Sequence, residues 1–312
     1  MIEQEQQIPQ VPVVPQASPV PNQEIPQSAP KAGFLRTLGL IWQNNKAKAG
    51  LIILGIFVFL AIFAPVLAPY SPTDSSFDSI ELPSATHLLG TTQSGQDVLS
   101  LLLYGTRTSL FMGFITGAFV IIIATIIGLL SGYLTGIPQE LLSFLTNVVL
   151  VIPGLPLMIV LASYLPFRGP WAIILVQSVV GWAWGARVLR SQTLSLRTRD
   201  YITAASFAGE GTWRIVTHEI MPNMTSLLAS SFFGAATGAV LGEAGLEFLG
   251  LGDPFVISWG TMLYWAQNSG ALLSGQWAWM IMPGLCIALL ATSLSLINFG
   301  IDAISNPKLR EN

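Results

Sequence analysis

The 312-residue sequence is poor in charge, in histidine and in cysteine. Charged residues make up 9% of the chain, whereas soluble domains contain about a quarter, so most of the surface must face an apolar environment. The single cysteine, Cys286, excludes an internal disulfide framework and any multi-cysteine metal site, and we expect it to be a small core residue. The net charge of −3 gives no basic field for nucleic acid. Neither a zinc-protease motif nor a phosphate-binding loop occurs.

Long apolar runs are what the sequence does contain. A helix of about 20 residues, rising about 1.5 Å per residue, crosses the roughly 30 Å hydrocarbon core of a bilayer. We therefore predict an all-α integral membrane protein with about six transmembrane helices, at residues 49–67, 110–132, 141–165, 171–189, 224–241 and 276–300. Gly113, Gly117 and Gly128 in the second span favour close helix contacts.

The ends of the chain differ in composition from this six-span domain, which we place at 49–306. Residues 1–33 are rich in Pro and Gln, and we predict a disordered tail, with a docking motif at Pro9, Pro12 and Pro15 as the alternative. Residues 34–48 have an amphipathic pattern that predicts a short interfacial helix. Residues 307–312 form a polar tail.

Three polar segments separate the spans. Residues 70–109 form the first, in which Gly95 to Tyr104 suggests a short helix lying against the bilayer. Pro138 and Glu140 mark a tight turn. The remaining two segments are 190–223 and 242–275.

The distribution of cations predicts the orientation. If the N-terminus is inside, all of the 13 Lys and Arg residues except Arg107 and Arg168 fall on or next to cytoplasmic segments. This agrees with the positive-inside rule. We expect a multi-pass protein of the cell membrane with both termini and the 190–223 segment in the cytoplasm, and with 70–109 and 242–275 outside.

The cytoplasmic segment carries a helical hairpin pattern over residues 201–223. Gly209 suits a left-handed turn, Thr212 can cap the second helix, and Pro222 can end it. Large apolar side chains on this segment need a partner surface or the membrane, unless the hairpin folds back on its own bundle; they are Phe207, Trp213 and Ile215.

Several residues keep two interpretations at this stage. Pro153 and Pro156 interrupt the third span, as a simple kink or as a pore-lining bend. Glu243 lies at the outer end of the fifth span, where structural pairing or interfacial exposure competes with a role in a substrate path. The Trp259–Trp279 region anchors the chain at the interface or forms a sugar-stacking platform.

The hairpin resembles the EAA loop of ABC-transporter permease subunits. The matching residues are Thr203-Ala204-Ala205, Gly209 and Ile220-Met221-Pro222-Asn223, with Thr203 in place of the family's leading Glu. Further matches resemble the C-type subunit of the dipeptide/oligopeptide permease family: His87-Leu-Leu-Gly-Thr91, Gly95-Gln-Asp-Val-Leu99, Glu243-Ala-Gly-Leu-Glu-Phe-Leu-Gly-Leu-Gly252, Ser258-Trp-Gly260 and Asn306-Pro-Lys308. Gln96 stands where relatives often have Arg, and Glu247 where a small polar residue is commoner.

The resemblance implies a permease subunit of an ATP-driven importer of the type I fold, with a cytoplasmic coupling helix. It implies a sister permease, two ABC ATPase subunits and an extracytoplasmic substrate-binding protein as partners. The chain itself would have no catalytic residue and no cofactor, because ATP and Mg²⁺ are used by the ATPases. It implies ATPase coupling through Thr203, Ala204, Ala205, Gly209, Trp213, Arg214, Ile220, Pro222 and Asn223. Candidate path residues are Pro153, Pro156 and Glu243.

The substrate implied by the resemblance is a di- or oligopeptide, with an oligosaccharide or nickel as alternatives within the same family. A secondary transporter is the rival class, but such proteins commonly carry mid-span charges for ion coupling, and the six predicted spans have almost none. A membrane-embedded enzyme would need a His, Cys or carboxylate constellation at one depth, and none is evident in the sequence.

Overall fold

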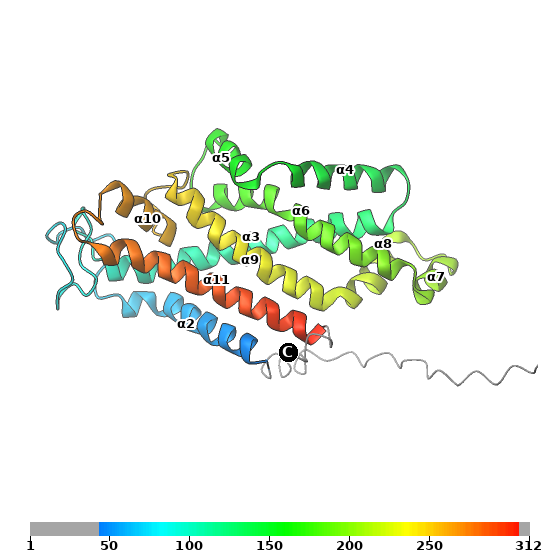
Figure 1. Ribbon diagram of the computed structural model, residues 1–312, viewed down its shortest axis with the longest axis horizontal. Helices are drawn as coiled ribbons and strands as arrows, with labels where there is room; N and C mark the ends of the chain where they lie inside the picture. Colours follow the sequence, from blue (N-terminus) through cyan, green and yellow to red (C-terminus); the bar gives the residue numbers. More distant parts are fainter. Residues whose placement is uncertain (1–43, 306–312) are drawn as a thin grey trace, which may run out of the picture. The chain divides into compact units, whose positions relative to one another are not determined.

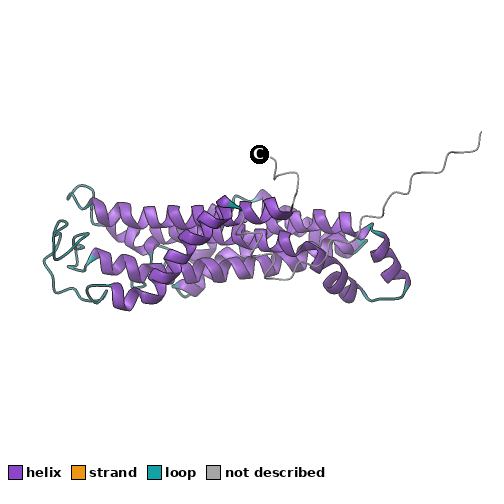
Figure 2. Ribbon diagram, turned by 90° about the horizontal axis from the view of Figure 1, so that it is seen from below, coloured by secondary structure: helices purple, strands orange, loops and turns teal. Residues whose placement is uncertain are grey.

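The computed structural model describes residues 44–305, and within this range the regular secondary structure is helical (Figures 1 and 2). The predictions for 1–33 and 307–312, and most of that for 34–48, fall outside the described residues. The described part of 34–48 is the start of the first span: Asn44 caps α2 by accepting hydrogen bonds from the backbone of Lys46 and Ala47.

The helices follow one another with short connections, except for the longer loops 68–97 and 249–258. In chain order they are α2 (Asn45–Leu67), α3 (Val98–Tyr133), α4 (Ile137–Val151), α5 (Gly154–Tyr164), α6 (Pro170–Arg197), α7 (Asp200–Phe207), α8 (Thr212–Arg214), the π-helical η1 (Ile215–Ile220), the 3₁₀ turn η2 (Met221–Met224), α9 (Thr225–Phe248), α10 (Trp259–Asn268) and α11 (Trp277–Ser305).

Five helical stretches in the described part of the chain are long and apolar enough to cross a membrane. They are α2, α3, α6, the stretch from Thr212 to Phe248, and α11. Helices α4 and α5 pass the same test only as a pair, and they meet at an angle of 93°. The chain therefore has five spans, or six if the bent pair counts as one, which confirms the predicted membrane fold.

The second span begins earlier than expected. The predicted short helix at 95–104 is not separate, because α3 runs without a break from Val98 to Tyr133. Asp97 starts it by accepting a hydrogen bond from the backbone N–H of Ser100, and no proline interrupts the 36 residues. Residues 98–109 of the predicted extracytoplasmic segment are thus the first turns of a long helix.

The third span is the least regular. The turn predicted at Pro138 and Glu140 lies just before them, at Gly136 with its positive φ of 70°, and both residues belong to the first turn of α4. Pro138 is tolerated there because the first backbone N–H groups of a helix have no partner within the helix. The break at Pro153, which precedes α5, is a near right-angle bend rather than a simple kink.

The fifth span is longer at both ends than predicted. Pro222 does not end the helix, because the chain continues from η1 through η2 into α9; the backbone departs from helical values at Met224, whose φ is −116° and ψ 11°, and returns to them at Thr225. At the other end α9 reaches Phe248 and includes Glu243 and Glu247, which the sequence had placed in or next to a polar segment. That segment, 242–275, also contains α10.

Close contacts at small residues hold the spans together. Helix α3 packs against α6 and α9, and α11 packs against α9 and α2 (Figure 1). A Cβ on Gly117 would lie 3.0 Å from Ala236 of α9, and one on Gly128 would lie 2.8 Å from the Ala186 carbonyl of α6. Gly113 is similarly tight against Val240. The three glycines predicted to allow close helix contacts do so.

Candidate functional site

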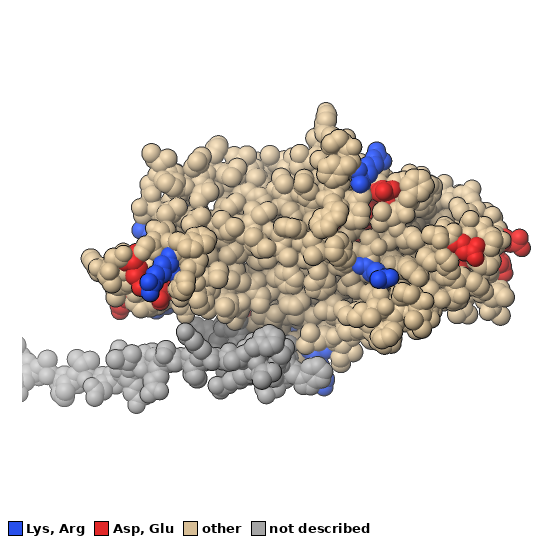
Figure 3. All heavy atoms as spheres, turned by 180° about the vertical axis from the view of Figure 1, so that it is seen from behind, with Lys and Arg blue, Asp and Glu red and all other residues tan. Residues whose placement is uncertain are grey.

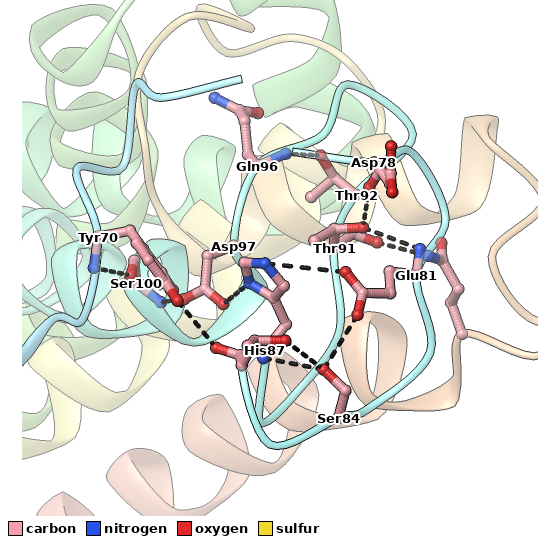
Figure 4. A network of polar contacts seen from close by, with 12 residues as sticks. Tyr70, Asp78, Glu81, Ser84, His87, Thr91, Thr92, Gln96, Asp97 and Ser100 are labelled. Atoms are coloured by element: carbon pink, nitrogen blue, oxygen red, sulfur yellow. Dashed lines mark hydrogen bonds and ion pairs between the residues drawn. The ribbon is translucent and has the colours of Figure 1, made fainter. Parts of the chain in front are cut away.

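The loop between α2 and α3 is organised by a buried histidine, His87 (Figure 4). The His87 ring packs against Tyr70 and Phe77, with ring centroids 5.0 and 4.7 Å away. Its Nδ1 lies 3.0 Å from Oδ1 of Asp97. The other oxygen of Asp97 accepts hydrogen bonds from the backbone N–H and the hydroxyl of Ser100. The same carboxylate therefore starts α3 and fixes the histidine.

This loop is also hydrogen-bonded to the segment that precedes the last described helix, α11. Gln276, just before α11, donates a side-chain hydrogen bond to the Thr91 carbonyl. The Thr91 hydroxyl donates to the Asp78 carbonyl at 2.6 Å and accepts from the Glu81 N–H at 2.9 Å (Figure 4). The His87–Thr91 and Gly95–Leu99 motifs are separate in the sequence. In the structure they form one hydrogen-bonded unit, joined by the contact of His87 with Asp97.

Glu243 is fully buried rather than exposed at the interface. Its exposed fraction is 0%, and its Oε1 accepts a hydrogen bond of 2.9 Å from the Ser109 hydroxyl of α3. One turn later, Glu247 accepts a hydrogen bond from Ser258, the residue that caps α10. Because two α9 carboxyl groups bond to α3 and α10, the geometry supports structural pairing.

Trp259 belongs to the core and neither anchors the chain at the interface nor offers a stacking platform. Its exposed fraction is 0%, its ring packs edge-on against Phe57 of α2, and its indole N–H donates to the Leu102 carbonyl of α3. Trp279 is buried as well. Trp265 and Trp277 of the same region are exposed, so interfacial anchoring stays a prediction for these two.

A cavity of about 420 Å³ lies between the long helices. Its uncharged polar side chains come from four spans: Thr116, Gln177, Ser230, Ser231 and Asn298. Asp302, near the end of α11, is the one ionisable side chain among the described residues that line it. Small residues give much of the remaining lining: Gly181, Gly185, Gly234, Ala235, Gly238 and Ala239.

The cavity reaches mid-span depth and is only partly enclosed by this chain. Thr116 is in the middle of α3, and Ser230 is in the middle of the stretch from Thr212 to Phe248. Hydroxyl and amide groups facing lipid tails at that depth would lose hydrogen bonds to water. The open side therefore requires another protein surface or water.

None of the three path candidates named from the sequence lines this cavity. Pro153 and Pro156 position α5 at the bend, and of that helix Met158 reaches the lining. Glu243 is sealed between α9, α3 and α10. The lining residues were not evident in the sequence, since isolated Thr, Ser and Asn residues in spans often bond only to their own helix.

The hairpin between α6 and α9 lies at the end of the molecule opposite to the α2–α3 loop (Figure 1). Gly209 has a φ of +83°, which confirms the predicted left-handed turn after α7. Thr212 makes no side-chain cap, because Gly211 occupies the cap position without a side chain. Thr203 is exposed, and its hydroxyl donates to the Arg199 carbonyl at 3.3 Å.

The hairpin has one apolar face in the bundle and another left open. Ile202, Ile215 and Ile220 are fully or almost fully buried against α3 and α6, so the expectation that Ile215 faces a partner is wrong. Phe207 and Trp213, on either side of the Gly209 turn, have exposed fractions of 88% and 67%. These two side chains form what we call the apolar tip.

The hairpin also carries polar and charged residues. Arg214 lies 3.5 Å from a carboxyl oxygen of Glu210, Asn223 donates to the Glu219 carbonyl, and Pro222 is exposed. Ala204 is exposed and Ala205 half-buried. Partial desolvation raises the pKa of the Tyr201 hydroxyl above its ordinary value, although the residue is partly exposed, and outweighs the opposing effect of the Arg199 guanidinium.

These features define a class: a multi-pass helical membrane protein with a mid-span cavity and an exposed apolar tip at one end. On the face seen in Figure 3, a broad uncharged band separates the charged atoms at one end from those in the other half, as in a chain that crosses a bilayer.

The chain belongs to the family described as the binding-protein-dependent transport system inner membrane component, whose profile matches residues 124–311. Residues 41–83 match the N-terminal transmembrane domain of oligopeptide transport permease C. It is therefore a permease subunit of an ABC importer.

Curated relatives support this assignment over most of the chain. The dipeptide transport system permease protein DppC of Bacillus subtilis is 33% identical over 275 residues, which cover 86% of this chain and 83% of the relative. DppC of Haemophilus influenzae is 33% identical over 293 residues, covering 91% and 97%. The oligopeptide transport system permease protein OppC of Bacillus subtilis is 31% identical over 271 residues, covering 86% and 87%.

Proposed function

We propose that this permease moves di- or oligopeptides through the mid-span cavity, with a sister permease closing the open side. The observation that carries the proposal is the cavity itself: uncharged hydrogen-bonding groups and small residues at the depth where lipid would not satisfy them. The names of the relatives supply the substrate class, since they are dipeptide and oligopeptide permeases.

The proposal places the hairpin in the cytoplasm. The loop between α2 and α3 and the segments around α10, which we call the outer loops, then lie outside the cell membrane. The cations near the hairpin support this orientation: Arg187, Arg190, Arg197, Arg199 and Arg214. The loops at the other end carry mainly carboxylates, among them Asp74, Asp78 and Asp253. On this arrangement the substrate-binding protein docks on the outer loops, and both termini are cytoplasmic.

The apolar tip is the contact to the ATPase subunits in this proposal. An exposed Phe and Trp beside a rigid turn, with charged residues around them, fit a cleft with an apolar floor and a polar rim. The chain would bind no cofactor of its own, and two partner ATPases would use ATP and Mg²⁺. Thr203 then contributes no charge to this contact, unlike the Glu at its position in the family pattern.

Reconstitution tests the proposal directly. The chain is placed in proteoliposomes with its sister permease, ATPases and binding protein, and ATP-dependent uptake of labelled tri-alanine is measured. We expect uptake that requires both ATP and the binding protein. Uptake of an oligosaccharide or of Ni²⁺ in place of the peptide would refute the substrate assignment, and uptake driven by an ion gradient without ATPases would refute the mechanism.

A further inference from the structure

One hydroxyl in the cavity has no partner. Thr116 has an exposed fraction of 1%, lines the cavity, and its Oγ1 makes no hydrogen bond within the described structure. Two other threonines of α3 behave differently: Thr106 donates to the Leu102 carbonyl at 3.0 Å and Thr125 to the Ile121 carbonyl at 2.6 Å. Thr116 is therefore placed so that its own helix does not satisfy it.

The neighbouring amide does not satisfy it either. With its amide oriented to meet its surroundings, Gln177 donates to the Ala239 carbonyl at 3.1 Å and accepts from the Glu243 N–H at 3.3 Å. Gln177 thus braces α6 against α9 rather than bonding to α3. Since a buried hydroxyl without a partner costs free energy, a ligand group that bonds to Thr116 would recover it.

The rest of the lining limits what that ligand group can be. Apart from its polar residues the wall is apolar and uncharged: Gly and Ala leave room, and the larger side chains include Met158, Trp184 and Leu227. A hydroxyl can both donate and accept, as a peptide group requires of its partner. Asp302, the ionisable residue of the described lining, is at the end of α11, whereas Thr116 is in the middle of α3.

We propose that Thr116 is a substrate-binding residue that bonds to the backbone amide of a peptide in transit, so that this step is indifferent to the charge of the peptide's side chains. The inference deepens the proposed function and rests on it. The mid-span position of Thr116 means that the contact forms inside the path and not at the docking surface for the binding protein.

The test uses the complete reconstituted transporter and three labelled probes: Ala-Ala-Ala, Ala-Lys-Ala and Ala-Glu-Ala. Thr116→Val removes the hydroxyl and keeps the shape, and we expect kcat/KM for uptake to fall roughly three- to tenfold, by the same factor for each probe. Thr116→Ser should retain uptake. Thr106→Val is the matched control, because it removes a buried hydroxyl of the same helix that does not line the cavity.

Thermal unfolding separates a binding role from a structural one. Since Thr116→Val deletes an unsatisfied hydroxyl, its Tm should equal or exceed that of the unaltered chain; a lower Tm together with lower uptake would indicate a structural residue and overturn the proposal. Unchanged uptake by this variant, or a loss confined to one side-chain charge, would also overturn it. If the unaltered transporter moves none of the three probes, the proposed function itself fails.

Discussion

Replacing Gly209 by valine tests whether the shape of the hairpin turn couples transport to ATP hydrolysis. Gly209 has a φ of +83°, where a residue with a Cβ costs about 1–2 kcal/mol and a β-branched residue more. A Cβ at this position meets nothing within 4 Å, so the penalty is one of backbone conformation and not of packing.

Gly211, two residues later, supplies the control. A Cβ there also meets nothing within 4 Å, but its φ of −70° and ψ of 152° lie in the extended region, which valine favours. The two substitutions add the same atoms to the same turn. Only Gly209→Val should shift the turn away from its native conformation, by roughly 5- to 30-fold in population for 1–2 kcal/mol.

The consequence is a displaced apolar tip, because the turn sets the position of Phe207 relative to Trp213. We expect Gly209→Val to insert in the membrane normally and to lose the ATPase stimulation by peptide-loaded binding protein, while Gly211→Val keeps it. Stimulated hydrolysis is measured in proteoliposomes, with surface expression as the control for insertion. Normal stimulation in Gly209→Val would show that the turn geometry does not matter for coupling.

Three further predictions follow from other contacts. Phe207→Ser should weaken binding of the ATPase subunits by about 10- to 100-fold, the equivalent of burying one aromatic side chain, and unchanged affinity in detergent pull-downs would contradict this. Gly260→Ala should lower Tm, since its Cβ would lie 2.6 Å from a carboxyl oxygen of Glu247, whereas Gly245→Ala, where a Cβ meets nothing, should not. Asp97→Ala should cost about 1 kcal/mol or more in thermal unfolding by removing a helix cap, and an unchanged Tm would argue against its role.

The elements that depend on local pattern were predictable from the sequence. Spans follow from hydropathy because a long uncharged run has few alternatives to a membrane helix. The turn at Gly209 follows from the tolerance of glycine for positive φ, and the tight contacts at Gly113, Gly117 and Gly128 from the small size of glycine. At the glycine positions a single residue type determines the outcome.

The features that depend on which helix faces meet were not predictable. Glu243 reads as a charge at a membrane edge, but its partner Ser109 lies 134 residues away in the chain. Thr116 reads as one more polar residue in a span, and only the packing of α3 against α6 and α9 shows that it faces a cavity. Pro222 reads as a helix end, but the π and 3₁₀ turns around it let the chain continue.

The two ends of this permease are stabilised by different interactions, and that difference bears on where motion occurs. At the end away from the hairpin the chain is cross-linked by polar contacts between distant segments, as between Thr91 and Gln276 or Ser109 and Glu243. At the hairpin, buried isoleucines hold one face while the apolar tip stays open. Apolar contacts are non-directional and allow sliding, whereas paired polar groups resist it. A force that a partner applies to the apolar tip should therefore move the hairpin together with the adjoining halves of α6 and α9. The outer loops should move as one body. The cavity lies between these two regions, so its shape should change with that motion.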